Sequence, residues 1–141
     1  MSALPVLHLA VTAAYAGLLW TVQMVVYPQF AEVPAAAFPA YHRRHMRRIA
    51  PLVGPLFLLE GSAAVAAFWL GVATQPILQS ASLGLFLAGH AVTFLVFVPL
   101  HGNPPEGPTR SWCRRLLRWN GIRTGLQSLR SGVVVALALT A

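Results

Sequence analysis

The chain has 141 residues, of which 57% are hydrophobic and only 9% are charged, and its formal net charge is +7. An ordinary soluble domain has about a quarter of its residues charged, so the composition excludes that class of protein. All ten basic residues are arginines, and most of them flank apolar stretches, where positive charge orients membrane proteins. We therefore predict a lipid bilayer, and no nucleic acid, as the partner of this charge.

Four apolar stretches are each long enough to cross a bilayer, which takes about 20 residues. They span residues 4–27, 49–70, 76–100 and 120–141. The first stretch lacks a basic segment in front of it and is longer than the apolar part of a signal peptide, so we predict that it is a retained helix. The sequence thus predicts one all-α domain, residues 1–141, that forms an integral membrane four-helix bundle with short loops.

Eight arginines lie in two of the three connections. Arg43, Arg44, Arg47 and Arg48 follow the first stretch, and Arg110, Arg114, Arg115 and Arg118 precede the last one. The positive-inside rule predicts that both connections face the cytoplasm and both termini lie outside, in a bacterial inner membrane. Residues 111–119, "SWCRRLLRW", are predicted to form a short interfacial helix with its tryptophans at headgroup level.

Each predicted helix carries a polar stripe. At 100° per residue, six polar residues of the last stretch fall within about 120° of one another. Such a stripe is costly against lipid, so we expect it to face the bundle interior. The stripe comprises Asn120, Arg123, Thr124, Gln127, Arg130 and Ser131. Weaker stripes comprise His8, Thr12, Tyr15, Gln23 and Tyr27 on the first stretch, and Ser82, His90, Thr93 and His101 on the third.

Four ionisable side chains share one level in these stretches. Glu60, His90, Arg130 and Tyr15 lie ten to twelve residues from the cytoplasmic end of their spans, about 15–18 Å deep. Because a lone charge at that depth is penalised, we expect Glu60 to pair with Arg130. Either this pair only fixes the helix register, or the layer is a catalytic site. In the second case Glu60 or His90 acts as a general base, and Arg130 or Arg123 stabilises the resulting anion.

A second polar layer is predicted near the cytoplasmic surface, with Gln23, Tyr27, His42, His45, His101, Asn120 and Arg123. His42 and His45 are spaced i, i+3, so both can reach one metal ion, with His101 as the third ligand. The alternative is that these interfacial histidines bind lipid headgroups or cap helix ends.

Four segments carry a resemblance to a known group of proteins. They are "WTVQMVVYPQF", "FPAYHRRHMRRIAPLVGPLFLLEG", "FVPLHG" and "RWNGIRTGLQSLRSG". In this order they resemble small four-helix bacterial membrane proteins of uncharacterised function that are related to anthrone-oxygenase-like proteins. The resemblance implies oxidation of polycyclic phenols without a tightly bound cofactor. It also implies Tyr27, His42, His45, His101, Asn120 and Arg123 as signature positions.

A weaker likeness is to the short membrane-type protoporphyrinogen oxidase, which carries heme. It rests on "LHLAVTAAYAGLLW", the following "YP" and "MRRIAP". This likeness implies His8 as a heme ligand.

Three functions therefore stay open. The chain is an oxidoreductase or oxygenase of a lipophilic phenol- or quinone-like substrate; a redox protein that holds heme or a transition metal; or a non-catalytic subunit or lipid-binding accessory of a larger membrane complex. In the redox protein, the histidine pair His8 and His90 is a second choice of ligands, and Gln23, Tyr27 and Asn120 would contact the cofactor. A homo-oligomer is compatible with each function.

Overall fold

A computed structural model describes residues 3–71 and 74–140, and these residues form helices joined by short connections, with no strand among them. Residue 141, the end of the last predicted span, lies outside the described residues. The first helical rod comprises α1 (Ala3–Thr21), η1 (Val22–Val26) and α2 (Tyr27–Phe30). The second comprises η2 (Ala35–Ala37) and α3 (Phe38–Gly71), and the third comprises α4 (Pro76–Val92), η3 (Thr93–Phe97) and α5 (Val98–Gly102). The fourth rod is α6 (Arg110–Leu139).

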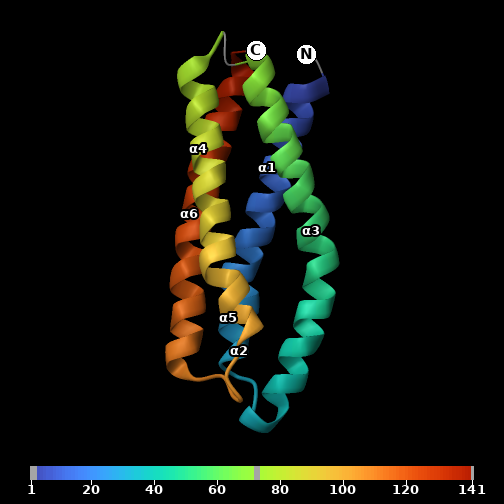
Figure 1. Cartoon of the computed structure of the whole chain (residues 1–141), viewed down its shortest axis with the longest axis vertical. Helices are drawn as coiled ribbons and strands as arrows, with labels where there is room; N and C mark the ends of the chain where they lie inside the picture. Colours follow the sequence, from blue (N-terminus) through green and yellow to red (C-terminus); the bar gives the residue numbers. More distant parts are fainter. Residues whose placement is uncertain (1–2, 72–73, 141) are drawn as a thin grey trace.

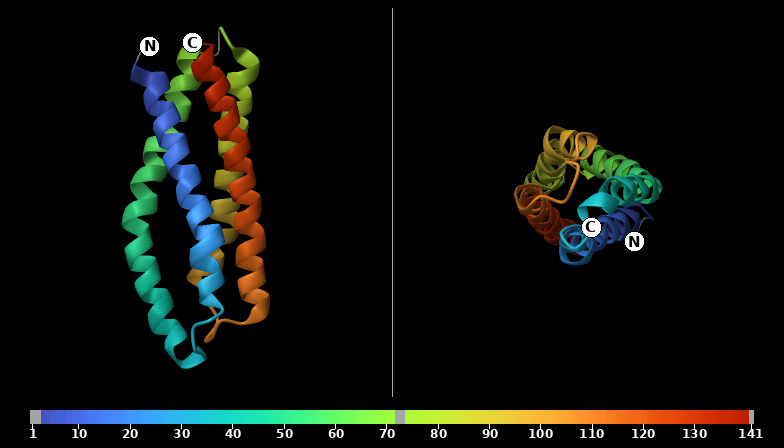
Figure 2. Two further views of the ribbon diagram at one scale, coloured as in Figure 1. Left: turned by 180° about the vertical axis from the view of Figure 1, so that it is seen from behind. Right: turned by 90° about the horizontal axis from the view of Figure 1, so that it is seen from below.

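The four rods form an up-and-down bundle (Figure 1). Each of α3 and α6 packs against both α1 and α4, so that α3 and α6 lie on opposite corners, as the end-on view in Figure 2 shows. The two arginine-rich connections lie together at the end of the bundle away from the termini (Figure 1). All eight arginines of these connections are exposed.

Three of the four rods are long and apolar enough to cross a membrane. They are Ala3–Phe30, Ala35–Gly71 and Pro76–Gly102. The rod formed by α6 is long enough, but its arginines and its polar stripe lower its hydropathy below that of the others. Because Asn120, Thr124 and Gln127 of that stripe are buried inside the bundle, the polarity of α6 is directed at its neighbours, as the sequence predicts.

The predicted interfacial helix is not a separate element. Residues 111–119 are the first turns of α6, which runs without a break from Arg110. Thr109 is its N-cap, and the hydroxyl of Thr109 accepts a hydrogen bond from the amide of Trp112. Trp112 was expected at headgroup level, yet it is buried and its indole N–H donates to the carbonyl of Leu100 at 3.3 Å. The indole therefore packs against the preceding rod and anchors α6 there.

Wide π-helical turns interrupt the first and third rods at equivalent places. Each turn precedes a proline: η1 is followed by Pro28, and η3 by Pro99. A proline lacks the amide that would bond four residues back, and its ring clashes with that carbonyl, so a wider turn relieves the conflict. One extra residue rotates all later side chains by about 100°. These turns consequently set the directions of Tyr27 and His101, which follow them.

The second rod is continuous although α3 contains Pro51 and Pro55. The two halves of α3 present the same helix face to the bundle interior, because His42 and Glu60 are both buried there. Figure 2 shows that α3 bows outward along its length, and we attribute this curvature to the two prolines.

Candidate functional site

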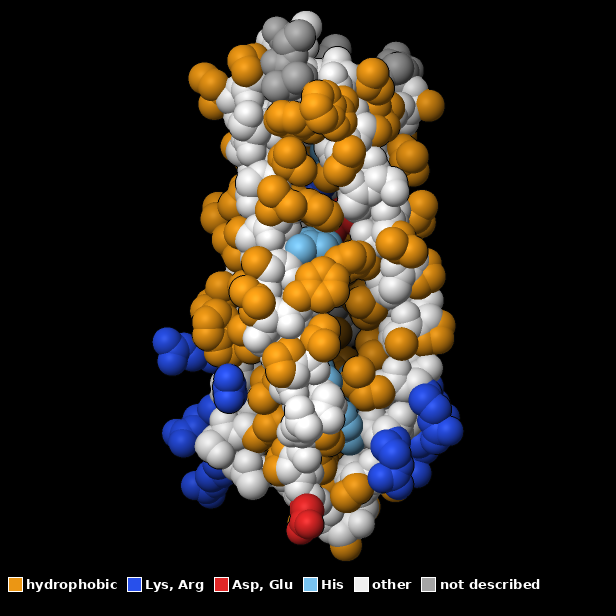
Figure 3. Space-filling view, viewed as in Figure 1, with side chains coloured by type: hydrophobic (Ala, Val, Ile, Leu, Met, Phe, Trp, Pro, Cys, Tyr) orange, Lys and Arg blue, Asp and Glu red, His pale blue; other side chains and the backbone are white. Residues whose placement is uncertain are grey.

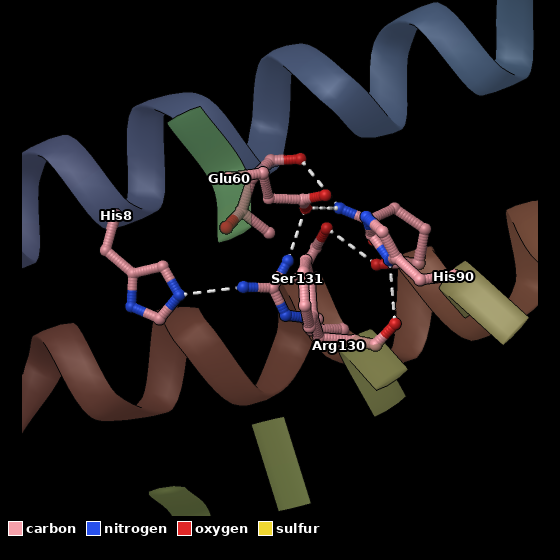
Figure 4. Close-up of polar contacts among 8 residues, drawn as sticks. His8, Glu60, His90, Arg130 and Ser131 are labelled. Carbon is pink, nitrogen blue, oxygen red and sulfur yellow. Dashed lines mark hydrogen bonds and ion pairs between the residues drawn. The ribbon is translucent and has the colours of Figure 1, made fainter. Parts of the chain in front are cut away.

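Glu60 and Arg130 form an ion pair in the middle of the bundle, as the sequence predicts. The Nη1 atom of Arg130 donates to Oε1 of Glu60, and Nε2 of Gln127 donates to the same oxygen. Because α3 and α6 occupy opposite corners, the pair joins helices on opposite sides of the bundle, and Figure 4 shows the two side chains pointing toward each other. Gln127 also donates to the carbonyl of Thr12 at 3.2 Å, which ties α1 into the same network.

The pair also recruits His8, a contact that the sequence does not predict. The Nη2 atom of Arg130 lies 2.9 Å from Nε2 of His8, which is 3% exposed (Figure 4). The sequence places His8 in the polar stripe of the first stretch, but not in the layer of Glu60 and Arg130. Counting residues gives the depth of an α-carbon only. The guanidinium of an arginine carries several donors at the end of a long side chain, so it can contact a group at another level. The polar stripe of the first helix was the signal that places His8 on the interior face.

The ion pair is closed. Both side chains are 0% exposed, and neither residue lines the two clefts described below. A carboxylate and a guanidinium that neutralise each other at this depth hold α3 to α6. A substrate has no open face of the pair to approach.

His90 and Tyr15 lie in the same layer but do not contact the ion pair by a hydrogen bond. His90 bonds through Nδ1 to the carbonyl of Phe86 in its own helix at 2.8 Å (Figure 4). Its ring packs between Phe57 and Phe86, with centroid distances of 4.2 and 3.8 Å, and stacks 6.1 Å from the ring of Tyr15. The aromatic ring of Phe86 also lies under the guanidinium of Arg130, so it separates His90 from that cation.

An apolar cleft of about 450 Å³ lies between α3 and the third rod, nearer the arginine-rich end. This volume is in the range of sites for small organic ligands. Figure 3 shows histidine surface inside a hollow on this face, among apolar side chains. The apolar lining is Val22, Met46, Ile49, Ala50, Val53, Phe97 and Val98. The polar lining is Tyr27, His45, Thr93, His101 and Arg123.

Arg123 is the charged group of this cleft. Its guanidinium stacks on the ring of Phe97 with its carbon 4.5 Å from the ring centroid, and Nη1 donates to the hydroxyl of Thr93 at 3.3 Å. The side chain is 8% exposed, and its Nε atom has no hydrogen-bond partner among residues 3–71 and 74–140. In the same part of the chain the ion pair of Arg130 with Glu60 is the one salt bridge, so Arg123 has no carboxylate partner there.

A hydrogen-bonded chain of three side chains runs from the cleft toward the arginine-rich end. The hydroxyl of Tyr27 lies 3.0 Å from Nε2 of His101, and Nδ1 of His101 lies 3.1 Å from Nε2 of His42. The ring of His45 lies 6.3 Å from that of His101, and it packs edge-on against Phe30 at 4.9 Å. Four residues of the predicted second layer, namely Tyr27, His42, His45 and His101, thus lie together.

Of the three histidines predicted as metal ligands, His42 and His101 are hydrogen-bonding partners, whereas His45 makes only a ring contact with His101. The nitrogens of His42 and His101 that face each other are engaged in their mutual hydrogen bond. Within the described ranges no group of three or more His, Cys, Asp or Glu side chains is placed to hold a metal ion.

Gln23 and Asn120, predicted to contact a cofactor, instead join α6 to the first rod. The Nδ2 group of Asn120 donates to Oε1 of Gln23 at 2.9 Å and to the carbonyl of Leu19 at 3.3 Å. Neither residue lines the cleft. Their geometry fits a contact between helices.

A second cleft, of about 360 Å³, lies at the opposite end of the bundle. Its lining is mainly apolar, and it includes His8, Thr74, Gln75 and Gln79.

Comparison of the chain with models of protein families, with curated proteins and with solved structures found no match.

Proposed function

We propose that the chain is an integral protein of a bacterial inner membrane, with its arginine-rich end in the cytoplasm and both termini outside. Apolar side chains cover much of the face drawn in Figure 3, and three rods are apolar enough to span a membrane, which supports insertion. Leu70, Ile77 and Leu95 are each more than three-quarters exposed. Exposed arginines gather at one end only, which supports the orientation. α6 then crosses the membrane with its polar stripe against the other rods.

Labelling of engineered cysteines tests this placement. In a Cys113→Ala background, Glu106→Cys lies at the arginine-rich end and Thr74→Cys at the other end. A membrane-impermeant maleimide added to spheroplasts should label the cysteine at position 74 and leave the one at 106 unlabelled until the membrane is broken. Equal labelling of both positions in intact spheroplasts would contradict the proposed orientation.

We propose that the cleft between α3 and the third rod binds a lipophilic phenol- or quinone-like molecule and that the protein acts on it as an oxidoreductase. The observation that carries this proposal is the buried charge of Arg123, which no carboxylate in the described residues neutralises. Burying an unpaired cation is costly, so a site of this kind is stabilised by an anion. An apolar cleft that ends in an arginine suits an apolar ring system with one acidic hydroxyl.

The side chains of the cleft supply the proton chemistry that such a substrate needs. The hydroxyl of the substrate approaches Tyr27 and His101, which accept its proton, and Arg123 stabilises the phenolate. A phenolate gives up electrons more easily than a phenol, and we name dioxygen as the acceptor. For an anthrone, the ring CH₂ becomes C=O, one oxygen atom of O₂ enters the product, and the other leaves as water with the two hydrogens removed.

The proposed substrate site does not include the central layer of Glu60, His90, Arg130 and Tyr15. They line neither cleft, and the ion pair of Glu60 with Arg130 is closed. We therefore assign the ion pair to the stability of the bundle and place the substrate near Arg123.

Oxygen uptake by the purified protein tests the oxidoreductase proposal. Anthrone and a short-chain quinol are supplied to protein in nanodiscs, and uptake is compared with that of empty nanodiscs. Arg123→Gln should abolish the protein-dependent uptake, whereas Arg118→Gln, which removes an exposed arginine of the same helix, should leave it unchanged. Uptake that Arg123→Gln does not reduce would contradict the assigned site.

A further inference from the structure

The chain of Tyr27, His101 and His42 leads away from the cleft. Tyr27 and His101 line the cleft, but His42 does not, and it is 3% exposed. The two hydrogen bonds, of 3.0 and 3.1 Å, join α2, α5 and α3, so residues from three rods meet in one line. A chain that only held the helices together has no need for groups that all both donate and accept a proton.

Aromatic rings enclose the far end of this chain. The ring of His42 lies 5.8 Å from Phe38, 5.9 Å from Trp112 and 6.2 Å from Phe30. All three of these aromatic side chains are buried. These rings surround the histidine pair, and His42 is the last residue of the hydrogen-bonded chain that begins at Tyr27.

The charged and titratable groups around His42 come from α2, α3, α5 and α6. His101 comes from α5, Tyr27 reaches it through His101, and His45 lies one turn away on α3. Arg123 on α6 lines the same cleft as His101. The exposed neighbours Arg43 and Arg44 place His42 within the arginine-rich end of α3.

We propose that Tyr27, His101 and His42 form a proton relay that carries the proton of the substrate hydroxyl from the cleft to His42. The relay rests on the proposed function, because it needs an acidic hydroxyl in the cleft. His42 does not touch the substrate and acts through the other two residues. Its role is to let the bound hydroxyl ionise by giving the released proton a place outside the cleft.

The proton transfer balances at each atom. At the start, Tyr27 donates its O–H to Nε2 of His101, and Nδ1–H of His101 donates to Nε2 of His42. The substrate proton moves to the oxygen of Tyr27, the former Tyr27 proton moves to Nε2 of His101, and the Nδ1 proton of His101 moves to Nε2 of His42. At the end Tyr27 and His101 are neutral, His42 is an imidazolium, and the substrate is a phenolate beside Arg123.

A coloured phenol tests the relay without requiring turnover. The probe is para-nitrophenol carrying a hexyl chain, whose phenolate absorbs visible light, and its methyl ether, which cannot ionise, reports binding alone. The pH at which the bound probe ionises is measured for the wild type, His42→Asn and Tyr27→Phe. Tyr41→Phe is the matched control, because Tyr41 is a tyrosine of α3 whose side chain does not line this cleft.

We expect His42→Asn and Tyr27→Phe each to raise the ionisation pH of the bound probe by about one unit, a tenfold loss of phenolate at fixed pH. Affinity for the methyl ether should stay within about twofold, and Tyr41→Phe should behave as the wild type. If His42→Asn does not fold, the result for Tyr27→Phe decides. Ionisation at the wild-type pH in the folded variants would overturn the relay, while failure of the wild type to bind the methyl ether would overturn the proposed cleft itself.

Discussion

Replacing Glu60 by glutamine tests whether the central ion pair stabilises the bundle. The substitution keeps the shape of the side chain and an oxygen for Gln127, but it leaves the 0% exposed Arg130 without a counter-charge. Breaking a buried pair by removing one partner costs about 3–5 kcal/mol. Because His8 and the new amide oxygen still accept hydrogen bonds from Arg130, we expect the lower end, about 3 kcal/mol.

Unfolding in mixed micelles, followed by tryptophan fluorescence, measures this loss. The double variant Glu60→Gln with Arg130→Gln removes both charges and should recover more than half of the lost free energy of unfolding, because no buried charge is then unpaired. Glu32→Gln, which neutralises an exposed glutamate, is the control and should change stability by less than about 0.5 kcal/mol. A Glu60→Gln variant as stable as the wild type would refute the stabilising role of the pair.

Three further substitutions test single contacts. Thr109→Ala should lower stability by about 1 kcal/mol in the same assay, because the N-cap of α6 is lost, and Thr109→Ser should restore most of it. Asn120→Ala should cost about 1–3 kcal/mol, since it removes the buried hydrogen bond to the carbonyl of Leu19 and the part-buried one to Gln23, whereas Ser111→Ala at the exposed start of α6 should cost little. Gly107→Ala should be destabilising, because its methyl group would lie 2.9 Å from that of Ala35; Gly102→Ala, which has open space, is the comparison.

The sequence predicts the helices and the central ion pair because helical periodicity and depth constrain both. Glu60 and Arg130 are among few charges inside apolar stretches, and each requires a partner. The grouping of Tyr27, His42 and His101 also follows from the number of residues that separates each of them from the arginine-rich end of the bundle. Periodicity thus suffices wherever the helix is regular and a polar side chain has to avoid lipid.

Other features depend on side-chain reach and on irregular backbone. The contact of His8 with Arg130 comes from the length of the arginine side chain. The π-helical turns before Pro28 and Pro99 shift the register in a way that a constant 100° per residue does not capture. The cleft beside Arg123 is lined by residues from all four rods, and Trp112 is buried against α5 of the preceding rod.

Photolabelling by a lipophilic phenol tests the proposed binding site most directly. A diazirine-bearing alkylphenol is crosslinked to the protein in nanodiscs, and the labelled residues are mapped by mass spectrometry. We predict labelling at Met46, Ile49, Val53 and Phe97, which line the cleft, and its loss in Arg123→Gln but not in Arg118→Gln. Labelling spread over the exposed faces of the helices, or equally strong in Arg123→Gln, would contradict a substrate site at Arg123.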